Sequence, residues 1–201
     1  MPSTVEVCNL ALSHLGISVE IASITERSEA ARACNRFFDI ARDFTLRDFL
    51  WPFATEFKTL ALVEEDPTDE WAYSYREPTE SLFIRRIVSG SRNDNEESSI
   101  PYKIIGDGSG RLIYTDEADA IVEITAKRDT PAIWTADFVM AVSFLLAGYI
   151  APRVTAGDPY KLGARALQLY SLFKSNAKRT AANEESPDVP PESGIVEAMT
   201  T

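Results

Sequence analysis

Few residues of this chain are suited to catalysis, and their spacing separates them. His14 is the only histidine, and Cys8 and Cys34 are the only thiols. A histidine can serve as a general base for a serine or cysteine, but Cys8 and His14 are six residues apart, which does not place them on one face of a helix. No Gly-x-Ser-x-Gly motif is present. We therefore expect His14 to face solvent or cap a helix.

The glycine-rich and acidic segments also do not match the motifs of phosphate-binding or metal-binding sites. "GDGSGR", residues 106–111, lacks the Gly-Lys-Ser/Thr of a phosphate loop and is explained by a hairpin turn. "EEDPTDE", residues 64–70, lacks the spacing and late Glu of a calcium loop, and two Cys with one His do not form a zinc ligand set. Paired carboxylates for sugar hydrolysis need only lie about 5–10 Å apart in space, and no spacing points to such a pair. We assign no catalytic, cofactor-binding or metal-binding residues.

The net charge and the hydropathy pattern narrow the possible classes of protein further. The 201 residues carry a formal net charge of -11, so the chain lacks the basic surface that binding of nucleic-acid phosphates requires.

The start "MPSTVEVCNL" lacks the basic region and the apolar stretch that a secretory signal has. The most apolar run, "FVMAVSFLLAGYIAP", is shorter than the roughly 20 residues of a spanning helix, so we expect a buried core helix. Both cysteines lie at apolar helical positions, which predicts buried thiols in a reducing compartment.

Two helices are expected at the amino-terminal end. Ser3 and Glu6 form a capping-box pattern, and Gly16 is placed to end the first helix. Its apolar stripe is Val5, Cys8, Leu12 and Leu15. A second helix is expected from about 28 to 48, ended by Pro52, which disfavours helical geometry at Trp51. Its predicted buried face is Cys34, Phe37, Phe38, Ala41 and Phe44.

From residue 53 the pattern alternates as in strands, and it becomes helical again near Pro131. The strand-like segments are "TEFKTL", "WAYSYR", "SLFIRRIV", "PYKIIG", "GRLIYT" and "AIVEITAK". "GDGSG" predicts a hairpin between two of them, and the segments 64–70 and 90–99 are expected to be long, mobile loops. An apolar helix is expected from about 135 to 151, closed by Pro152 and Gly157. Another follows Asp158-Pro159, with Leu162, Leu169, Tyr170, Phe173 and Ala177 inward.

These patterns predict an α+β protein: a helical bundle made by the amino- and carboxy-terminal helices, with an inserted, mostly antiparallel β lobe. The expected domains are a discontinuous bundle of residues 1–50 and 130–182, a lobe of residues 53–128, and an acidic tail of residues 183–201. Trp51-Pro52 would mark the exit from the bundle. Phe49, Trp51 and Phe53 would pack where bundle and lobe meet.

Three motifs carry a resemblance to a known family. They are "CNLALSHLG" at residues 8–16, "IASITERSEA" at 21–30, and "ARD" at 41–43 followed by "WPFA" at 51–54. In these the chain resembles the tail tubular protein A family of short-tailed phages, the head-to-tail adaptors or connectors. "AGYIAPRVTAGDP", residues 147–159, also looks like the family's second half. The likeness covers about residues 5–182, is specific at the front and weaker through the strands, and does not include the tail.

The resemblance implies a non-enzymatic structural protein of a bacteriophage virion, located in the tail or neck and assembled in the host cytoplasm. It implies a portal-binding, dodecameric ring of about twelve copies between portal protein and tail nozzle protein. Genomic DNA would pass through the ring during DNA ejection without specific binding, and neither cofactor nor membrane is involved. The implied fold, a helical bundle with an inserted β lobe, agrees with the pattern above.

Two further interpretations remain open at this stage. The chain could be a tail-associated enzyme that degrades peptidoglycan, or a prophage-borne copy with the same structural role. The tail carries apolar residues but cannot build a core alone, so it either orders against a portal groove or stays disordered. In the first case Ile195, Val196 and Met199 are the expected portal-binding residues.

Overall fold

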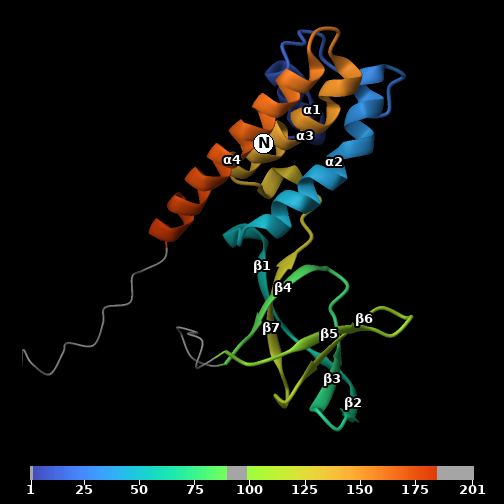
Figure 1. Ribbon diagram of the computed structural model, residues 1–201, viewed down its shortest axis with the longest axis vertical. Coiled ribbons are helices and arrows are strands. Elements are labelled where there is room, and N and C mark those ends of the chain that lie inside the picture. The colour runs from blue at the N-terminus through green and yellow to red at the C-terminus, as the bar shows by residue number, and fades with distance from the viewer. Residues whose placement is uncertain (1, 90–98, 185–201) are drawn as a thin grey trace, which may run out of the picture.

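The computed structural model describes residues 2–89 and 99–184. It is an α+β fold, as the sequence predicts: helices from both ends of the chain form a bundle, and the strands between them form a lobe on one side of it (Figure 1). The helices are α1 (Thr4–His14), α2 (Glu29–Asp48), α3 (Ala136–Val154) and α4 (Pro159–Glu184). Two short 3-10 turns, Pro52–Ala54 and Pro131–Ile133, stand where the chain leaves and re-enters the bundle.

The bundle is arranged around α3, which packs against α1, α2 and α4. Its buried residues lie on every side of the helix, as expected for an apolar helix enclosed by others. By length and composition α3 could also cross a membrane, but more than half of it is buried inside the fold, which agrees with the predicted core helix. The capping box of α1 is formed: Ser3 accepts from the Glu6 amide, and Glu6 accepts from the Ser3 amide.

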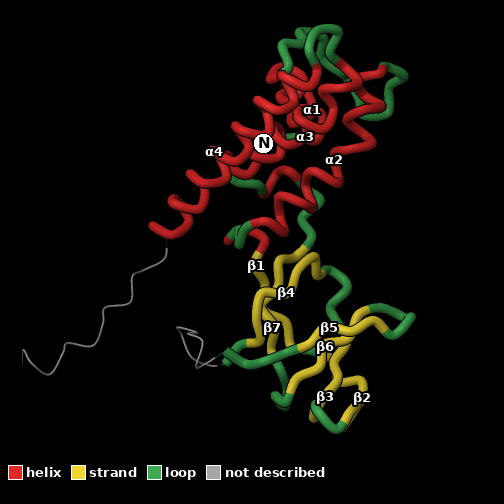
Figure 2. Tube along the Cα trace, viewed as in Figure 1, coloured by secondary structure: helices red, strands yellow, loops and turns green. Residues whose placement is uncertain are grey.

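The lobe contains two antiparallel sheets (Figure 2). One has the order β1-β7-β4, and the other β2-β3-β6-β5. The strands are β1 (Thr55–Thr59), β2 (Ala61–Thr68), β3 (Trp71–Arg76), β4 (Ser81–Ile87), β5 (Lys103–Gly106), β6 (Arg111–Thr115) and β7 (Ile121–Ala126). The predicted "GDGSG" hairpin joins β5 and β6: Gly106 pairs with Arg111, and the turn places Gly108 at a φ of 81°. Ile84, Ile113, Val122 and Ile124 lie at the centre of the lobe's core.

Several sequence predictions are corrected by the structure. Residues 64–70 are not a long mobile loop, because residues up to Thr68 belong to β2, which pairs with β3 across two irregularities. Phe44 is half exposed, because α3 covers the opposite face of α2. Pro152 does not close α3 but lies inside its last turn. The loop predicted at 90–99 falls almost entirely outside the described residues.

The apolar core is divided in the same way as the elements. One cluster of buried residues comes from the four helices and the Trp51 region, and a smaller one comes from the strands. Whether bundle and lobe act as separate domains stays a prediction, as does the boundary at 182; α4 continues to Glu184. Between the two clusters the chain crosses twice, and side chains at these crossings fix the position of the lobe.

Candidate functional site

An aromatic cluster lies at the first crossing. Trp51 is 2% exposed and contacts Phe49, Phe53 and Phe138. Its indole Nε1 donates to the Thr45 carbonyl of α2 at 2.8 Å, so the buried polar atom is satisfied. The predicted packing of Phe49, Trp51 and Phe53 is therefore present, and α3 supplies Phe138 as a further partner.

An arginine from the lobe caps the end of α2. The Arg85 guanidinium, on β4, donates to the carbonyls of Leu46, Arg47 and Phe49 at 3.2, 3.0 and 2.8 Å. The last carbonyls of a helix lack partners within the helix and attract positive charge. Burial lowers the pKa of Arg85 from its usual value. One side chain of the lobe thus anchors the sheet to the bundle.

Ion pairs hold the second crossing. Arg42 of α2 is buried and pairs with Asp129 at 3.0 Å, and also with Asp39 and Asp43. Burial by itself would lower the pKa of Arg42, but these carboxylates raise it above the usual value. Arg128 pairs with Glu56 of β1. The returning chain is therefore tied to both the bundle and the lobe.

The carboxy-terminal helix passes over the end of α2 at the same place. Asp48 accepts a hydrogen bond from the Tyr170 hydroxyl at 2.8 Å and one from Lys174 Nζ at 2.5 Å. Burial alone would raise the pKa of Asp48, but the bonds from Lys174 and Tyr170 hold it below the usual value. Lys178 lies 5.6 Å from the ring centre of Phe49. α4 thus passes beside the junction at Tyr170, Lys174 and Lys178 and continues to Glu184.

A groove opens on the surface of this junction. Its volume is about 230 Å³, and Phe44, Arg47, Asp48 and Phe83 line it; we name it the junction groove. Phe44 and Phe83 are 50% and 37% exposed. Arg47 and Arg85 lie over the Phe83 ring at 5.8 and 4.7 Å, within the range of cation–π attraction. Two accessible aromatic rings, with guanidinium groups over the ring of Phe83, are suited to binding a partner rather than to catalysis.

His14, predicted to face solvent or to cap a helix, is partly exposed and packs against α3. Its Nε2 lies 3.0 Å from the Ser143 hydroxyl of α3, and its ring stacks on Phe144 at 3.9 Å. Ser143 is completely buried and donates to the Met140 carbonyl. A buried serine cannot reach a substrate, so this pair ties α1 to α3. Burial lowers the pKa of His14.

The cysteines are free and buried, as predicted. The two thiols contact each other between α1 and α2, and that contact together with burial raises the pKa of Cys8. A neutral, buried thiol is neither a nucleophile nor a ready metal ligand. The pair therefore belongs to the bundle core.

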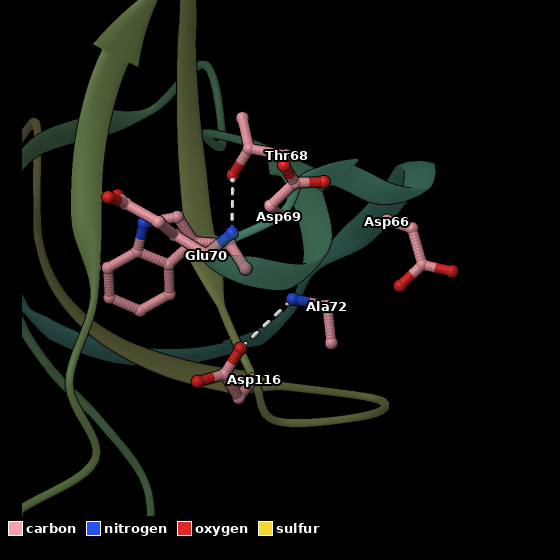
Figure 3. A pocket seen from close by; sticks show the side chains of 7 residues that line it. Asp66, Thr68, Asp69, Glu70, Ala72 and Asp116 are labelled. Atoms are coloured by element: carbon pink, nitrogen blue, oxygen red, sulfur yellow. Dashed lines mark hydrogen bonds between the residues drawn. The ribbon is translucent and has the colours of Figure 1, made fainter.

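An acidic depression lies at the β2–β3 turn (Figure 3). Its volume is about 370 Å³, and its carboxylates come from Asp66, Asp69, Glu70 and Asp116. Figure 3 shows these carboxylates pointing in different directions, and Asp116 accepts the Ala72 amide at 2.9 Å. Within the described ranges, no three His, Cys, Asp or Glu residues are placed to share a metal ion.

The predicted portal-binding residues Ile195, Val196 and Met199 lie outside the described residues. The junction groove, with the exposed Phe44 and Phe83, was not predicted, because a groove made by a helix end and a distant strand leaves no local sequence signal.

No protein-family model matches the chain, and no curated protein matches it in sequence.

Proposed function

We propose that this protein is a structural head-to-tail adaptor of a tailed-phage virion. It forms a ring between the portal protein and the tail nozzle protein, and genomic DNA passes through the ring. The observation that carries the proposal is the resemblance of "CNLALSHLG", "IASITERSEA" and "WPFA" to the tail tubular protein A family.

The placement of those motifs supports an architectural role. Asn9 exchanges two hydrogen bonds with the Ile21 backbone, which fixes the connector after α1. Glu26 accepts the Ala22 amide and the Ser28 hydroxyl just before α2. Trp51 fills the bundle–lobe junction. Residues that carry the likeness therefore build the fold, as expected if the shared property is a shape that fits neighbours in a particle.

Charge and composition are compatible with this role. A ring through which DNA slides must hold the phosphates weakly, and a net charge of -11 gives no general attraction for them. The tail residues Ile195, Val196 and Met199 would be the anchors on the portal. Each would contribute about 1.5–3 kcal/mol if buried, against about 1–2 kcal/mol lost for each residue that becomes ordered.

The test is reconstitution with purified portal. We expect rings of the full chain seated on portal rings in negative-stain electron microscopy. A chain lacking residues 185–201 should keep its thermal unfolding transition, because α4 ends at Glu184, but should attach to portal more weakly. Replacing Ile195, Val196 and Met199 with serine should reproduce the loss, whereas replacing Pro187 and Pro190 with serine should not.

Two outcomes would overturn parts of the proposal. Equal portal attachment of the truncated chain would remove the role of the tail. Release of soluble fragments from purified peptidoglycan by the full chain would favour the enzyme interpretation over the structural one.

A further inference from the structure

The junction groove has the size and lining of a side-chain pocket. Small-molecule sites usually have volumes of about 300–1,000 Å³ and enclose the ligand, whereas this groove measures about 230 Å³, and four of the described residues line it. Its apolar floor consists of the accessible rings of Phe44 and Phe83. Such a surface suits one or two apolar side chains of a docked peptide segment.

The groove is also a basic spot on an acidic protein. Arg47 is exposed, and among the described residues no carboxylate forms an ion pair with it. Asp48, the acid among the described lining residues, is already bonded to Lys174 and Tyr170. Lys178 adds a further positive charge nearby. A segment that binds here should therefore combine apolar side chains with acidic ones.

The chain itself provides such a segment. Residues 185–201 contain four acids, Glu185, Asp188, Glu192 and Glu197, and no Lys or Arg. They also contain the apolar residues Val189, Ile195, Val196 and Met199.

The segment is also long enough to reach the groove. Figure 1 shows the carboxy-terminal end of α4 at the level of the bundle–lobe junction. Lys178 still contacts Phe49, and the six residues from there to Glu184 add about 9 Å of helix. The eleven residues from Glu184 to Ile195 can span up to about 36 Å. The groove is therefore within reach of Ile195, Val196 and Met199 of the same chain.

From this geometry we propose that, in the free subunit, residues 185–201 dock into the junction groove of their own chain. Ile195, Val196 or Met199 contacts Phe44 and Phe83, and the acidic residues of the segment face Arg47 and Lys178. Tethering raises the local concentration of the segment to about the millimolar range, so a weak contact is enough. The docked segment covers the exposed rings of Phe44 and Phe83 until another partner displaces it.

Site-specific photo-crosslinking of the full chain tests the proposal. A benzophenone amino acid replaces Phe83, and the irradiated monomer is digested and analysed by mass spectrometry. We expect intrachain crosslinks from position 83 to peptides of residues 185–201. The matched control carries the same amino acid at Tyr160, which is 79% exposed at the other end of α4; it should give few crosslinks to that segment.

Changes in the segment separate docking from simple proximity. With the crosslinker at position 83, replacing Ile195, Val196 and Met199 with serine should lower the yield about tenfold for each side chain that is buried in the contact. Neutralising the four acids should lower it about threefold, and Ile195→Val alone should change it little. Circular dichroism checks that the fold is unchanged.

Three results would overturn the inference: crosslinks to a second copy in place of residues 185–201, equal yields from positions 83 and 160, or yields that survive the serine replacements. The measurement uses the free subunit and no portal. A failure to bind portal with these crosslinks intact would count against the adaptor role and leave the docking in place.

Discussion

The bundle and the lobe are stabilised by different means. Among the described residues, 27 buried apolar residues, mainly from the four helices and the Trp51 region, form one cluster in the bundle. In the lobe the corresponding cluster has nine, and the edge strand β2 is exposed from residue 61 to 66. Because burial of apolar surface is the main favourable term in folding, the bundle provides most of the stability, and the lobe depends more on its backbone ladders and on its attachment.

The difference shows where the position of the lobe is controlled. Surface ion pairs such as Arg76–Asp107 contribute little by themselves. The contacts that join the lobe to the bundle are better shielded: Trp51 is buried, and Arg85 reaches three carbonyls at the end of α2. Changes at the junction should therefore loosen the lobe before they unfold the bundle, unless they also open the bundle core.

The largest effect is expected from Trp51→Ala, because Trp51 belongs to the bundle core as well as to the junction. Loss of the indole removes the contacts with Phe49 and Phe138 and leaves the Thr45 carbonyl without its partner. We expect a loss of about 3–5 kcal/mol in the free energy of unfolding, measured by urea denaturation. Phe57→Ala, at a 60% exposed position, is the control and should change it by less than about 0.5 kcal/mol. Equal losses in the two variants would show that the buried indole contributes no more to the free energy of unfolding than an exposed ring does.

Arg85→Met should separate the lobe from the bundle with a smaller effect. The substitution keeps the apolar stem but leaves the carbonyls of Leu46, Arg47 and Phe49 without the guanidinium. We expect a loss of about 1–3 kcal/mol and faster amide hydrogen exchange in β4 and the last turn of α2, with the α1–α3 contact unchanged. Arg36→Met, on the exposed side of α2, is the matched control. Faster exchange throughout the bundle would contradict the assignment of Arg85 to the junction alone.

The elements with local signals could be predicted from the sequence. The capping box of α1, the bounds of β3 and the glycine hairpin each depend on residues that are close in the chain. The sequence does not reveal β2, because its acidic run is typical of a loop and only its pairing with β3 makes it a strand. Tertiary pairing of this kind overrides local propensity.

Apart from the packing of Phe49, Trp51 and Phe53, the side-chain contacts of the candidate site could not be predicted, because the partners are distant in sequence. Arg85 lies 36–39 residues from the carbonyls that it caps, and Ser143 lies 129 residues from His14. The helical spacing of Phe44 predicts a core position, but the structure places it on the junction groove. The helical periodicity of apolar residues predicts which face of a helix is buried. It does not predict how far along that face a neighbouring helix covers it.

The close approach of α3 and α4 offers a test of how tightly the bundle is packed. A Cβ added at Gly148 would lie 2.7 Å from Leu167 Cδ2, so that side chain would have to move. Leu167 is partly exposed and can do so, and we expect Gly148→Ala to cost about 1 kcal/mol. Gly157→Ala, where a Cβ would meet nothing within 4 Å, should be neutral or slightly stabilising. Thermal unfolding of both variants measures the contrast; a stabilised Gly148→Ala would show that the helices can separate without cost.

The smallest effect concerns the contact between α1 and α3 and depends on pH. Burial against Phe144 lowers the pKa of His14 below its usual value of 6.5. Between the lowered pKa and 6.5, the unfolded chain therefore binds more protons than the folded chain. Stability then rises with pH in this window: the contribution of neutral His14 is complete above pH 6.5 and is lost as the pH falls toward the lowered pKa. Urea denaturation at pH 7.5 and 5.5 should show this decrease, and His14→Gln, which cannot titrate, should show less of it.

Because the Asp and Glu carboxylates titrate alike in both proteins, the difference between the two pH profiles isolates the contribution of the histidine. A variant profile identical to that of the parent would mean that His14 is protonated equally in the folded and unfolded chain, and that the His14–Ser143 contact does not respond to pH.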